Sequence, residues 1–169
     1  MKGDTWLILG GARSGKTRRA LAIANAYASR TYIATAEARD GEMRERIARH
    51  RAERDETWHT IEVPLDLCGT LRKADREGGI IVVDCLTLWL SNLTEKGAAV
   101  EDETAKLIDV LSSMSAAVVV ISNEVGFGIV PDNALSRAFR DAQGRLNQAV
   151  AAAADHVELT VAGLPLVLK

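Results

Sequence analysis

The chain has 169 residues, of which 47% are hydrophobic and 26% are charged, and its formal net charge is −2. This composition excludes an intrinsically disordered chain, and the length predicts one domain over residues 1–169 that buries its own core. The slightly negative charge predicts no general affinity for nucleic acid or for an anionic membrane, so any phosphate-binding group must be local.

The first half of the chain alternates between short apolar runs and segments with helical spacing. Strands are expected where a short apolar run is bounded by glycine or proline, and helices where alanine and leucine recur at helical spacing. In chain order, these patterns predict a strand at residues 5–9, a helix at 16–29, a strand at 31–35, a polar helix at 41–54, a strand at 57–63 and a helix at 65–77.

The second half supplies the centre of the predicted sheet. The runs IIVVD (80–84) and AVVVIS (117–122) are unbroken and β-branched, which is typical of parallel strands covered on both faces. Helices are predicted at 102–113 and 133–154, and the segments HVELTV and PLVLK predict two strands around a glycine turn at an antiparallel edge. Together these elements predict a three-layer α/β fold with a mainly parallel central sheet.

GGARSGKT, residues 10–17, satisfies the GxxxxGK[ST] pattern of a phosphate-binding loop. In such a loop the backbone amides turn toward phosphate oxygens, Lys16 adds a cation for the β and γ groups, and Thr17 offers a hydroxyl to Mg²⁺. The match stands between a predicted strand and a predicted helix, which favours a nucleotide site over a simple glycine turn. Arg13 makes the loop unusually cationic.

Polar side chains follow the two central strands. Asp84 ends IIVVD, where it can hold Mg²⁺ together with Thr17 or, alternatively, cap a helix that begins at DCLT. Asn123 and Glu124 follow AVVVIS and begin the segment NEVGFGIVP. Ligands of open α/β sheets bind at the carboxyl ends of strands, so both are candidates for a crevice beside the phosphate loop, with an ordinary glycine-rich connection as the alternative. The missing NKxD motif disfavours a signalling GTPase.

The segment RERIARHRAER, residues 44–54, places one histidine among arginines. On a helix, Arg46, His50 and Arg54 are four apart and share one face, with Met43 and Ile47 available to anchor the adjoining face. The two guanidinium groups lower the proton affinity of the imidazole and favour its neutral form, which can attack phosphorus. A solvated surface histidine is the alternative, and the residues alone leave this choice open.

Two features bear on the compartment. Cys68 and Cys85 are isolated and fit no CxxC spacing, so we expect reduced thiols that act as small hydrophobic side chains. The apolar run at residues 6–9 is too short for a signal segment, and no later run approaches the ~18 apolar residues of a membrane helix. We therefore expect a cytoplasmic protein without stable membrane insertion.

Together these segments resemble the bifunctional adenosylcobinamide kinase / adenosylcobinamide-phosphate guanylyltransferase family of cobalamin biosynthesis. The phosphate loop alone is generic, whereas DGEMRERIARH and NEVGFGIVP are close to diagnostic. The chain departs from the family pattern after the histidine, where Asp55 follows Arg54 in place of the usual proline. The resemblance covers nearly the whole chain, in the family's order, through GGARSGKT, YIATA, DGEMRERIARH, WHTIE, VVDCLTLWLSN, NEVGFGIVP and RAFRDAQGRLNQAVAAAADHV.

The resemblance implies an enzyme that phosphorylates adenosylcobinamide with ATP or GTP and then transfers GMP from GTP to the product. The guanylyl group would pass through a histidine at the position of His50, giving adenosylcobinamide-GDP and pyrophosphate. The resemblance also implies a RecA-like P-loop fold, Mg²⁺ and a homotrimer with active sites near subunit boundaries. A single-function P-loop small-molecule kinase is the nearest alternative, and the charge and the few aromatic residues disfavour a RecA-like module on single-stranded DNA.

The family's site residues carry over onto matching positions of this chain. His50 and Lys16 would be catalytic. Glu62 and Asp84 would read guanine or ribose, which competes with the magnesium role of Asp84, and both roles stay open. The nucleotide contacts implied in this way are Leu9, Gly10, Gly11, Ala12, Arg13, Ser14, Gly15, Lys16, Thr17, Ala34, Thr35, Ala36, Arg51, Ala52, Glu53, Arg54, Glu62 and Asp84.

Overall fold

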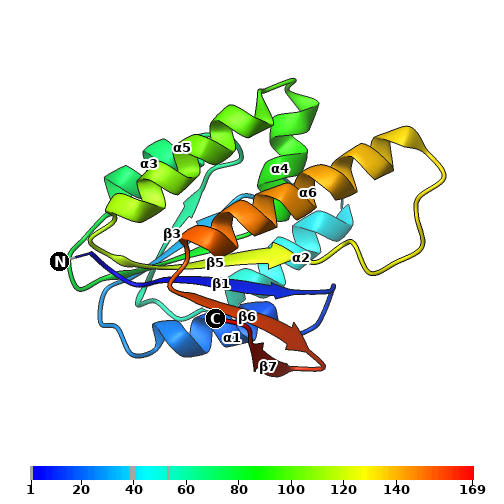
Figure 1. Cartoon of the computed structure of the whole chain (residues 1–169). Coiled ribbons are helices and arrows are strands. Elements are labelled where there is room, and N and C mark those ends of the chain that lie inside the picture. Colours follow the sequence, from blue (N-terminus) through cyan, green and yellow to red (C-terminus); the bar gives the residue numbers. More distant parts are fainter. Residues whose placement is uncertain (1, 39–40, 53) are drawn as a thin grey trace.

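The computed structural model describes residues 2–38, 41–52 and 54–169, and the side chains of residues 42, 46, 49 and 50 lie outside this description. Strands and helices alternate along most of the chain (Figure 1). The elements are β1 (Thr5–Gly10), α1 (Lys16–Ala24), β2 (Arg30–Ala34), α2 (Gly41–Ala52), β3 (Trp58–Glu62), α3 (Leu67–Ala74), β4 (Ile80–Asp84), α4 (Leu86–Glu95), α5 (Val100–Ser113), β5 (Ala117–Asn123), α6 (Ala134–Ala153), β6 (His156–Val161) and β7 (Leu164–Val167).

The strands form one seven-stranded sheet in the order β3-β2-β4-β5-β1-β6-β7. The two β-branched runs are β4 and β5, which pair in parallel from Ile80↔Ala117 to Asp84↔Ile121 at the centre of the sheet. β1 lies between β5 and β6 and is parallel to both, while β6 and β7 are antiparallel. The predicted parallel sheet with an antiparallel C-terminal edge is confirmed.

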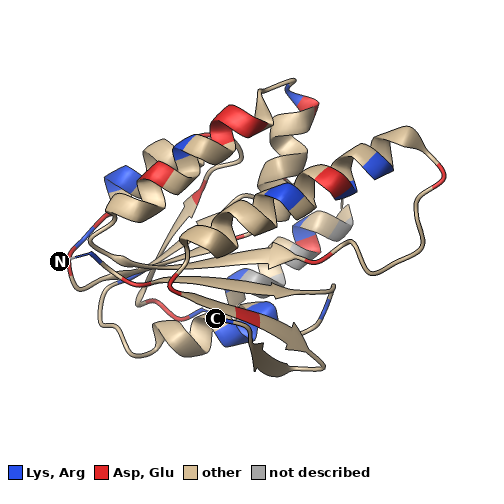
Figure 2. Ribbon diagram, in the orientation of Figure 1, with Lys and Arg blue, Asp and Glu red and all other residues tan. Residues whose placement is uncertain are grey.

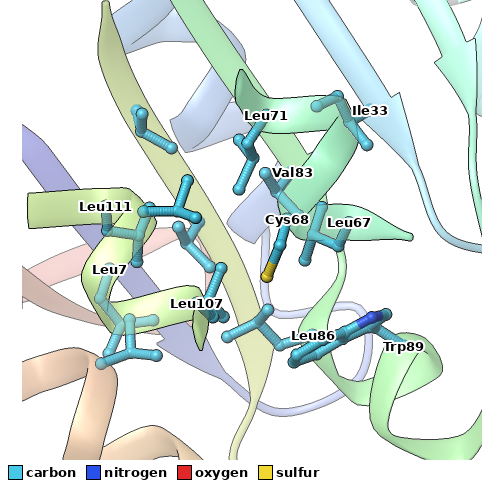
Figure 3. Close-up of a cluster of buried hydrophobic side chains, with 14 of the residues drawn as sticks. Leu7, Ile33, Leu67, Cys68, Leu71, Val83, Leu86, Trp89, Leu107 and Leu111 are labelled. Atoms are coloured by element: carbon cyan, nitrogen blue, oxygen red, sulfur yellow. The ribbon is translucent and has the colours of Figure 1, made fainter. Parts of the chain in front are cut away.

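Helices cover both faces of the sheet and make the fold three-layered. On one face, side chains of α3, α4, α5 and α6 pack on β1, β2, β4, β5 and β6 in a large aliphatic cluster with Trp89 (Figure 3). On the other face, α1 packs through Ala20 and Ala24. Cys68 and Cys85 are buried in these two clusters, on opposite faces of the sheet, and each acts as the expected small hydrophobic side chain.

Several predicted helix bounds were wrong because hydrogen bonds next to the helix ends favour other backbone conformations there. α1 stops at Ala24 and not at residue 29. The turn that follows is stabilised by the Arg30 guanidinium, which donates to the Tyr27 carbonyl at 2.7 Å. α3 begins after Asp66, whose carboxylate accepts from the Gly69 amide, and it ends before Asp75. The Asp75 carboxylate accepts from the backbone amides of residues 115 and 116.

Two further corrections concern α2 and α4. α2 ends at Ala52, so Arg54 lies beyond the helix that was predicted to include it. α4 was foreseen only as the helix at DCLT that Asp84 could cap, although its buried residues Leu86, Trp89, Leu90 and Leu93 recur at helical spacing. No helix in the described part of the chain is both long and apolar enough to cross a membrane.

Candidate active site

The predicted phosphate loop connects β1 to α1, and two glycines give it its shape. Gly10 has φ 153°, and a Cβ there would come within 2.5 Å of the Ser14 Oγ and the Thr160 carbonyl. Gly15 has φ 101° and begins α1 without a side-chain cap. A side chain is therefore disfavoured at both positions, and the start of α1 has the uncapped setting in which helix amides bind phosphate.

Lys16 is the first residue of α1 and is 8% exposed. Its Nζ donates to the Gly11 carbonyl across the loop at 2.6 Å. The loop is also held from outside, because the Ser14 carbonyl accepts from the Gly163 amide, in the turn between β6 and β7, at 2.8 Å. The ammonium group is thus enclosed by the loop in which a polyphosphate would bind.

Asp84, at the end of β4, lies beside the phosphate loop. Its Oδ2 accepts from the Thr17 hydroxyl at 3.1 Å and from the Tyr32 hydroxyl at 2.5 Å. The peptide bond that follows, Asp84–Cys85, is cis. The N-cap residue of α4 is Cys85 and has no side-chain capping bond, so the alternative in which Asp84 caps this helix is wrong.

The Thr17 hydroxyl and the Asp84 carboxylate are the oxygen donors that Mg²⁺ prefers. Mg²⁺ is usually bound through one or two carboxylates, substrate phosphates and water, and not by a complete cage of side chains. In residues 2–38, 41–52 and 54–169, no group of three or more His, Cys, Asp or Glu could hold a metal ion by itself. These residues therefore fit a cation that arrives with a nucleotide.

A pocket opens at the carboxyl ends of β2, β3, β4 and β5, below α2. Met43 and Ile47 of α2 line it, as predicted for the anchoring face of that helix. Arg51 donates to Glu62 at 2.5 Å across the pocket. A second, more open hollow, with Arg30, Lys73 and Arg76, lies at the amino ends of β2 and β3, away from the phosphate loop. The predicted site residues that line the first pocket are Ala34, Ala36, Arg51, Arg54, Glu62, Asp84 and Asn123.

Thr35 lies between two lining residues but its side chain is fully buried. Its Oγ1 donates to the Cys85 carbonyl at 2.7 Å and accepts from the Cys85 amide at 2.9 Å. The Asn92 side chain donates to the Thr35 carbonyl from α4. The Thr35 side chain therefore fixes the backbone after Asp84, and through it the pocket wall.

The two candidate residues after β5 differ in orientation. Asn123 lines the pocket, and its carbonyl accepts from the Asn147 side chain at 3.1 Å. The Glu124 carboxylate turns back and accepts from the Gly126 amide at 2.6 Å, while the Glu124 amide donates to the Gly10 carbonyl. Asn123 thus faces the crevice, and Glu124 joins the loop after β5 to the phosphate loop.

The arginine-rich segment does not keep the single helical face that its spacing predicted. The backbone places His50 near the end of α2, and its side chain, like residue Glu53, lies outside the described structure. Arg54 follows the helix, and its guanidinium carbon lies 3.6 Å from the centre of the Tyr32 ring. Sequence reasoning missed Tyr32, whose only signal was its place in the YIATA segment.

Comparison with known proteins extends these observations. The family model for cobinamide kinase / cobinamide phosphate guanyltransferase matches residues 6–168. The chain is 47% identical over 166 residues to the bifunctional adenosylcobalamin biosynthesis protein CobP of Pseudomonas aeruginosa, with 96% of each chain covered. It is 40% identical to the CobU protein of the same description from Salmonella typhimurium, over 96% of this chain and 98% of the relative. The CobU protein of Escherichia coli is 37% identical over the same shares.

Proposed function

The chain belongs to the cobinamide kinase / cobinamide phosphate guanyltransferase family, and from this premise we propose that it catalyses both reactions. In the first, it phosphorylates adenosylcobinamide with ATP or GTP. In the second, it transfers GMP from GTP to adenosylcobinamide phosphate through His50. The observation that carries the proposal is the hydrogen bond from Thr17 to Asp84, which joins the phosphate loop to the pocket below α2.

In the kinase reaction the protein's work is positioning and charge neutralisation. Lys16 and the uncapped start of α1 would bind the β and γ phosphates, and Gly10 to Gly15 would contact them through the backbone. Thr17 and Asp84 would hold Mg²⁺, which supplies charge neutralisation at the phosphate oxygens. The corrinoid hydroxyl then attacks the γ-phosphorus, and the nucleoside diphosphate leaves.

In the guanylyl transfer, the reaction needs a nucleophile that the kinase reaction does not. A ring nitrogen of His50 attacks the α-phosphorus of GTP, the P–O bond to pyrophosphate breaks, and a histidine phosphoramidate forms. A phosphate oxygen of adenosylcobinamide phosphate then displaces the histidine and takes GMP. Arg51 and Glu62, which pair across the pocket, are suited to hold the nucleotide, and Asp84 serves either its ribose and base or its metal ion.

Labelled GTP tests this proposal. Protein incubated with α-labelled GTP should retain label after denaturation, in a bond that is labile to acid and stable to base, whereas γ-labelled GTP should leave none. His50→Ala should abolish this labelling and slow guanylyl transfer by at least about 10³-fold while phosphoryl transfer survives. His59→Ala is the matched control, because His59 is an exposed histidine of β3 that lines the hollow at the amino ends of β2 and β3.

Each outcome of the labelling experiment points to one function. Retention of α-label by His50→Ala, or an acid-stable adduct in the wild type, would contradict the role of His50. A wild type that phosphorylates adenosylcobinamide but never captures α-label would identify a kinase with a single function. The absence of both activities would contradict the proposal as a whole.

We also propose that the protein is a cytoplasmic homotrimer that binds corrinoids and nucleotides but not nucleic acid. Apolar side chains that are exposed in a single chain support self-association. Phe127 and Ile129, in the loop after β5, are 83% and 97% exposed, and Leu164 of β7 is 72% exposed. Light scattering should give three times the chain mass of 18.2 kDa, and a concentration-independent monomer would contradict the trimer.

A further inference from the structure

Tyr32 is a large polar side chain at the base of the pocket, and it comes from a strand that carries no recognised catalytic motif. It lies in β2, paired with Thr60 of β3 on one side and Val82 of β4 on the other, and it is 2% exposed. Its hydroxyl donates to Asp84 at 2.5 Å, and Thr17 donates to the same carboxylate oxygen. Tyr32 therefore helps to set the orientation of the carboxylate nearest the phosphate loop.

The surroundings of the Tyr32 hydroxyl favour this hydrogen bond. Burial raises the pKa of the Tyr32 hydroxyl, and the charge of Asp84 and the hydrogen bond to it raise the pKa further. The Tyr32 hydroxyl is the donor and the Asp84 carboxylate is the acceptor. A hydrogen bond to a charged group is among the stronger ones in proteins.

The ring of Tyr32 makes a separate contact with the segment that follows α2. The Arg54 guanidinium lies 3.6 Å from the ring centre, close enough for a cation–π interaction. The Trp58 ring forms a T-shaped pair with the same ring, with centroids 6.1 Å apart and planes at 82°, which restricts the tilt of the Tyr32 ring. One rigid ring therefore positions the chain four residues beyond His50, while its hydroxyl positions Asp84.

Resting on the proposed function, we propose that Tyr32 is a positioning residue whose hydroxyl and aromatic ring have different roles. The hydroxyl orients Asp84 for both phosphoryl and guanylyl transfer. The ring seats Arg54, and with it the end of the segment that carries His50, for guanylyl transfer alone. The two reactions should therefore respond differently to removal of the hydroxyl and removal of the ring.

Two substitutions separate the hydroxyl from the ring. Tyr32→Phe removes the hydrogen bond to Asp84 and keeps the ring below Arg54, so the kcat/KM of both reactions should fall by about tenfold. Tyr32→Leu removes both contacts. It should match Tyr32→Phe in the kinase reaction and lose about a further fivefold or more in single-turnover labelling of His50 at saturating GTP.

Tyr27→Phe is the matched control, because it removes a hydroxyl from a partly buried tyrosine that packs in the same cluster but does not line the pocket. This variant should keep both activities. The Mg²⁺ concentration for half-maximal kinase activity should rise in Tyr32→Phe and stay unchanged in Tyr27→Phe, which a purely structural role of Tyr32 would not predict. If Tyr32→Leu does not fold, Arg54→Lys replaces it, since this change keeps the charge and removes the planar stack.

The outcomes distinguish this inference from the proposed function. Wild-type protein with both activities supports the proposed function whatever the Tyr32 variants do. Equal activity of Tyr32→Phe and wild type would overturn the role of the hydroxyl. An equal loss of His50 labelling in Tyr32→Phe and Tyr32→Leu, or full labelling of Arg54→Lys at saturating GTP, would overturn the role of the ring.

Discussion

Asp84 accepts hydrogen bonds from Thr17 of α1 and Tyr32 of β2, which precede it in the sequence by 67 and 52 residues. Two donors on one oxygen hold the carboxylate in a defined direction. An oriented anion beside a cationic loop suits either a metal ion bound to phosphate or a nucleotide hydroxyl. The two roles differ in their response to magnesium.

Asp84→Asn should separate these roles. If Asp84 binds Mg²⁺, raising the magnesium concentration should restore part of the lost activity, because weaker binding is offset by mass action. If Asp84 contacts ribose or guanine, the GTP requirement should rise and magnesium should restore nothing. Initial rates over a grid of magnesium and GTP concentrations measure both effects, and wild-type rates at low magnesium would contradict both roles.

Lys16→Ala should impair both reactions, because the ammonium group neutralises charge on the β and γ phosphates in each. A loss of at least about 10²-fold in kcat/KM is expected for each reaction. The Lys16 side chain also donates to the Gly11 carbonyl, so the thermal unfolding midpoint of the variant separates an effect on folding from an effect on catalysis. Normal turnover by a folded Lys16→Ala protein would contradict the phosphate-binding role of residues 10–17.

At the scale of elements, a bidentate ion pair fastens α1 to β6. Arg19 Nε and Nη2 each donate to one oxygen of Glu158 at 2.7 Å, where Figure 2 shows a basic turn of α1 beside an acidic position of β6. The Glu158 side chain is 8% exposed and that of Arg19 is 35% exposed. The carboxylate therefore depends on its partner more than the guanidinium does.

This asymmetry predicts unequal effects of the two single substitutions. Arg19→Met leaves a charged carboxylate in a dry site and should lower the free energy of unfolding by about 2–3 kcal/mol. Glu158→Gln leaves a guanidinium that can reach water and should cost about 1 kcal/mol. Urea unfolding of both variants at neutral pH measures the difference, and the reverse order would contradict the burial argument.

The elements that could be predicted were those whose sequence decides their structure locally. The β-branched runs of β4 and β5 and the glycine pattern of the phosphate loop carry their own signals, and parallel pairing then brings Asp84 and Asn123 to one edge of the sheet. The segment after α2 makes a tertiary contact through Arg54 and the Tyr32 ring, which the sequence does not show, whereas α4 carries its own helical spacing and was foreseen only as a helix at DCLT. The place of Tyr32 also needed the strand order, since only pairing of β2 with β4 brings it to Asp84.

At the scale of the whole molecule, the beginning of β1 is fastened to the start of β6. The Thr5 amide donates to Asp155 at 2.8 Å, and the Asp155 amide donates to the Thr5 carbonyl at 2.9 Å. Lys2 adds an ion pair at 3.2 Å, with both side chains about two-fifths exposed. The backbone hydrogen bond is the main cause, and Lys2 a lesser one, of a lowered pKa of the Asp155 carboxyl.

A lowered pKa of an acid makes the stability of the protein depend on pH. The charged Asp155 stabilises the folded state fully above the usual aspartate range near pH 4, and this contribution disappears as the pH falls through the lower pKa of the folded state. Asp155→Asn keeps an acceptor for Thr5 but loses the charge. The stability difference between wild type and Asp155→Asn should be at most about 1 kcal/mol at pH 7 and should shrink below pH 4.

Urea unfolding of the two proteins at neutral and acidic pH tests this dependence. Lys2→Met in the same series removes the ion pair and retains the hydrogen bond, so it should reproduce only the smaller part of the effect. A stability difference that stays constant from neutral to acidic pH would show that the charge of Asp155 contributes nothing.

The contact between Gly163 and the phosphate loop also bears on how the protein is made. A ribosome synthesises residues 10–17 well before Thr160 and Gly163, yet these two later residues form the outer wall of that loop. Domains usually fold as units while the chain emerges, with earlier parts first. In this protein the nucleotide-binding motif emerges before Thr160 and Gly163, which hold it in shape. A nascent chain arrested before residue 160 should therefore bind no ATP. Nucleotide binding can therefore stabilise the chain only after synthesis has passed the β6–β7 turn.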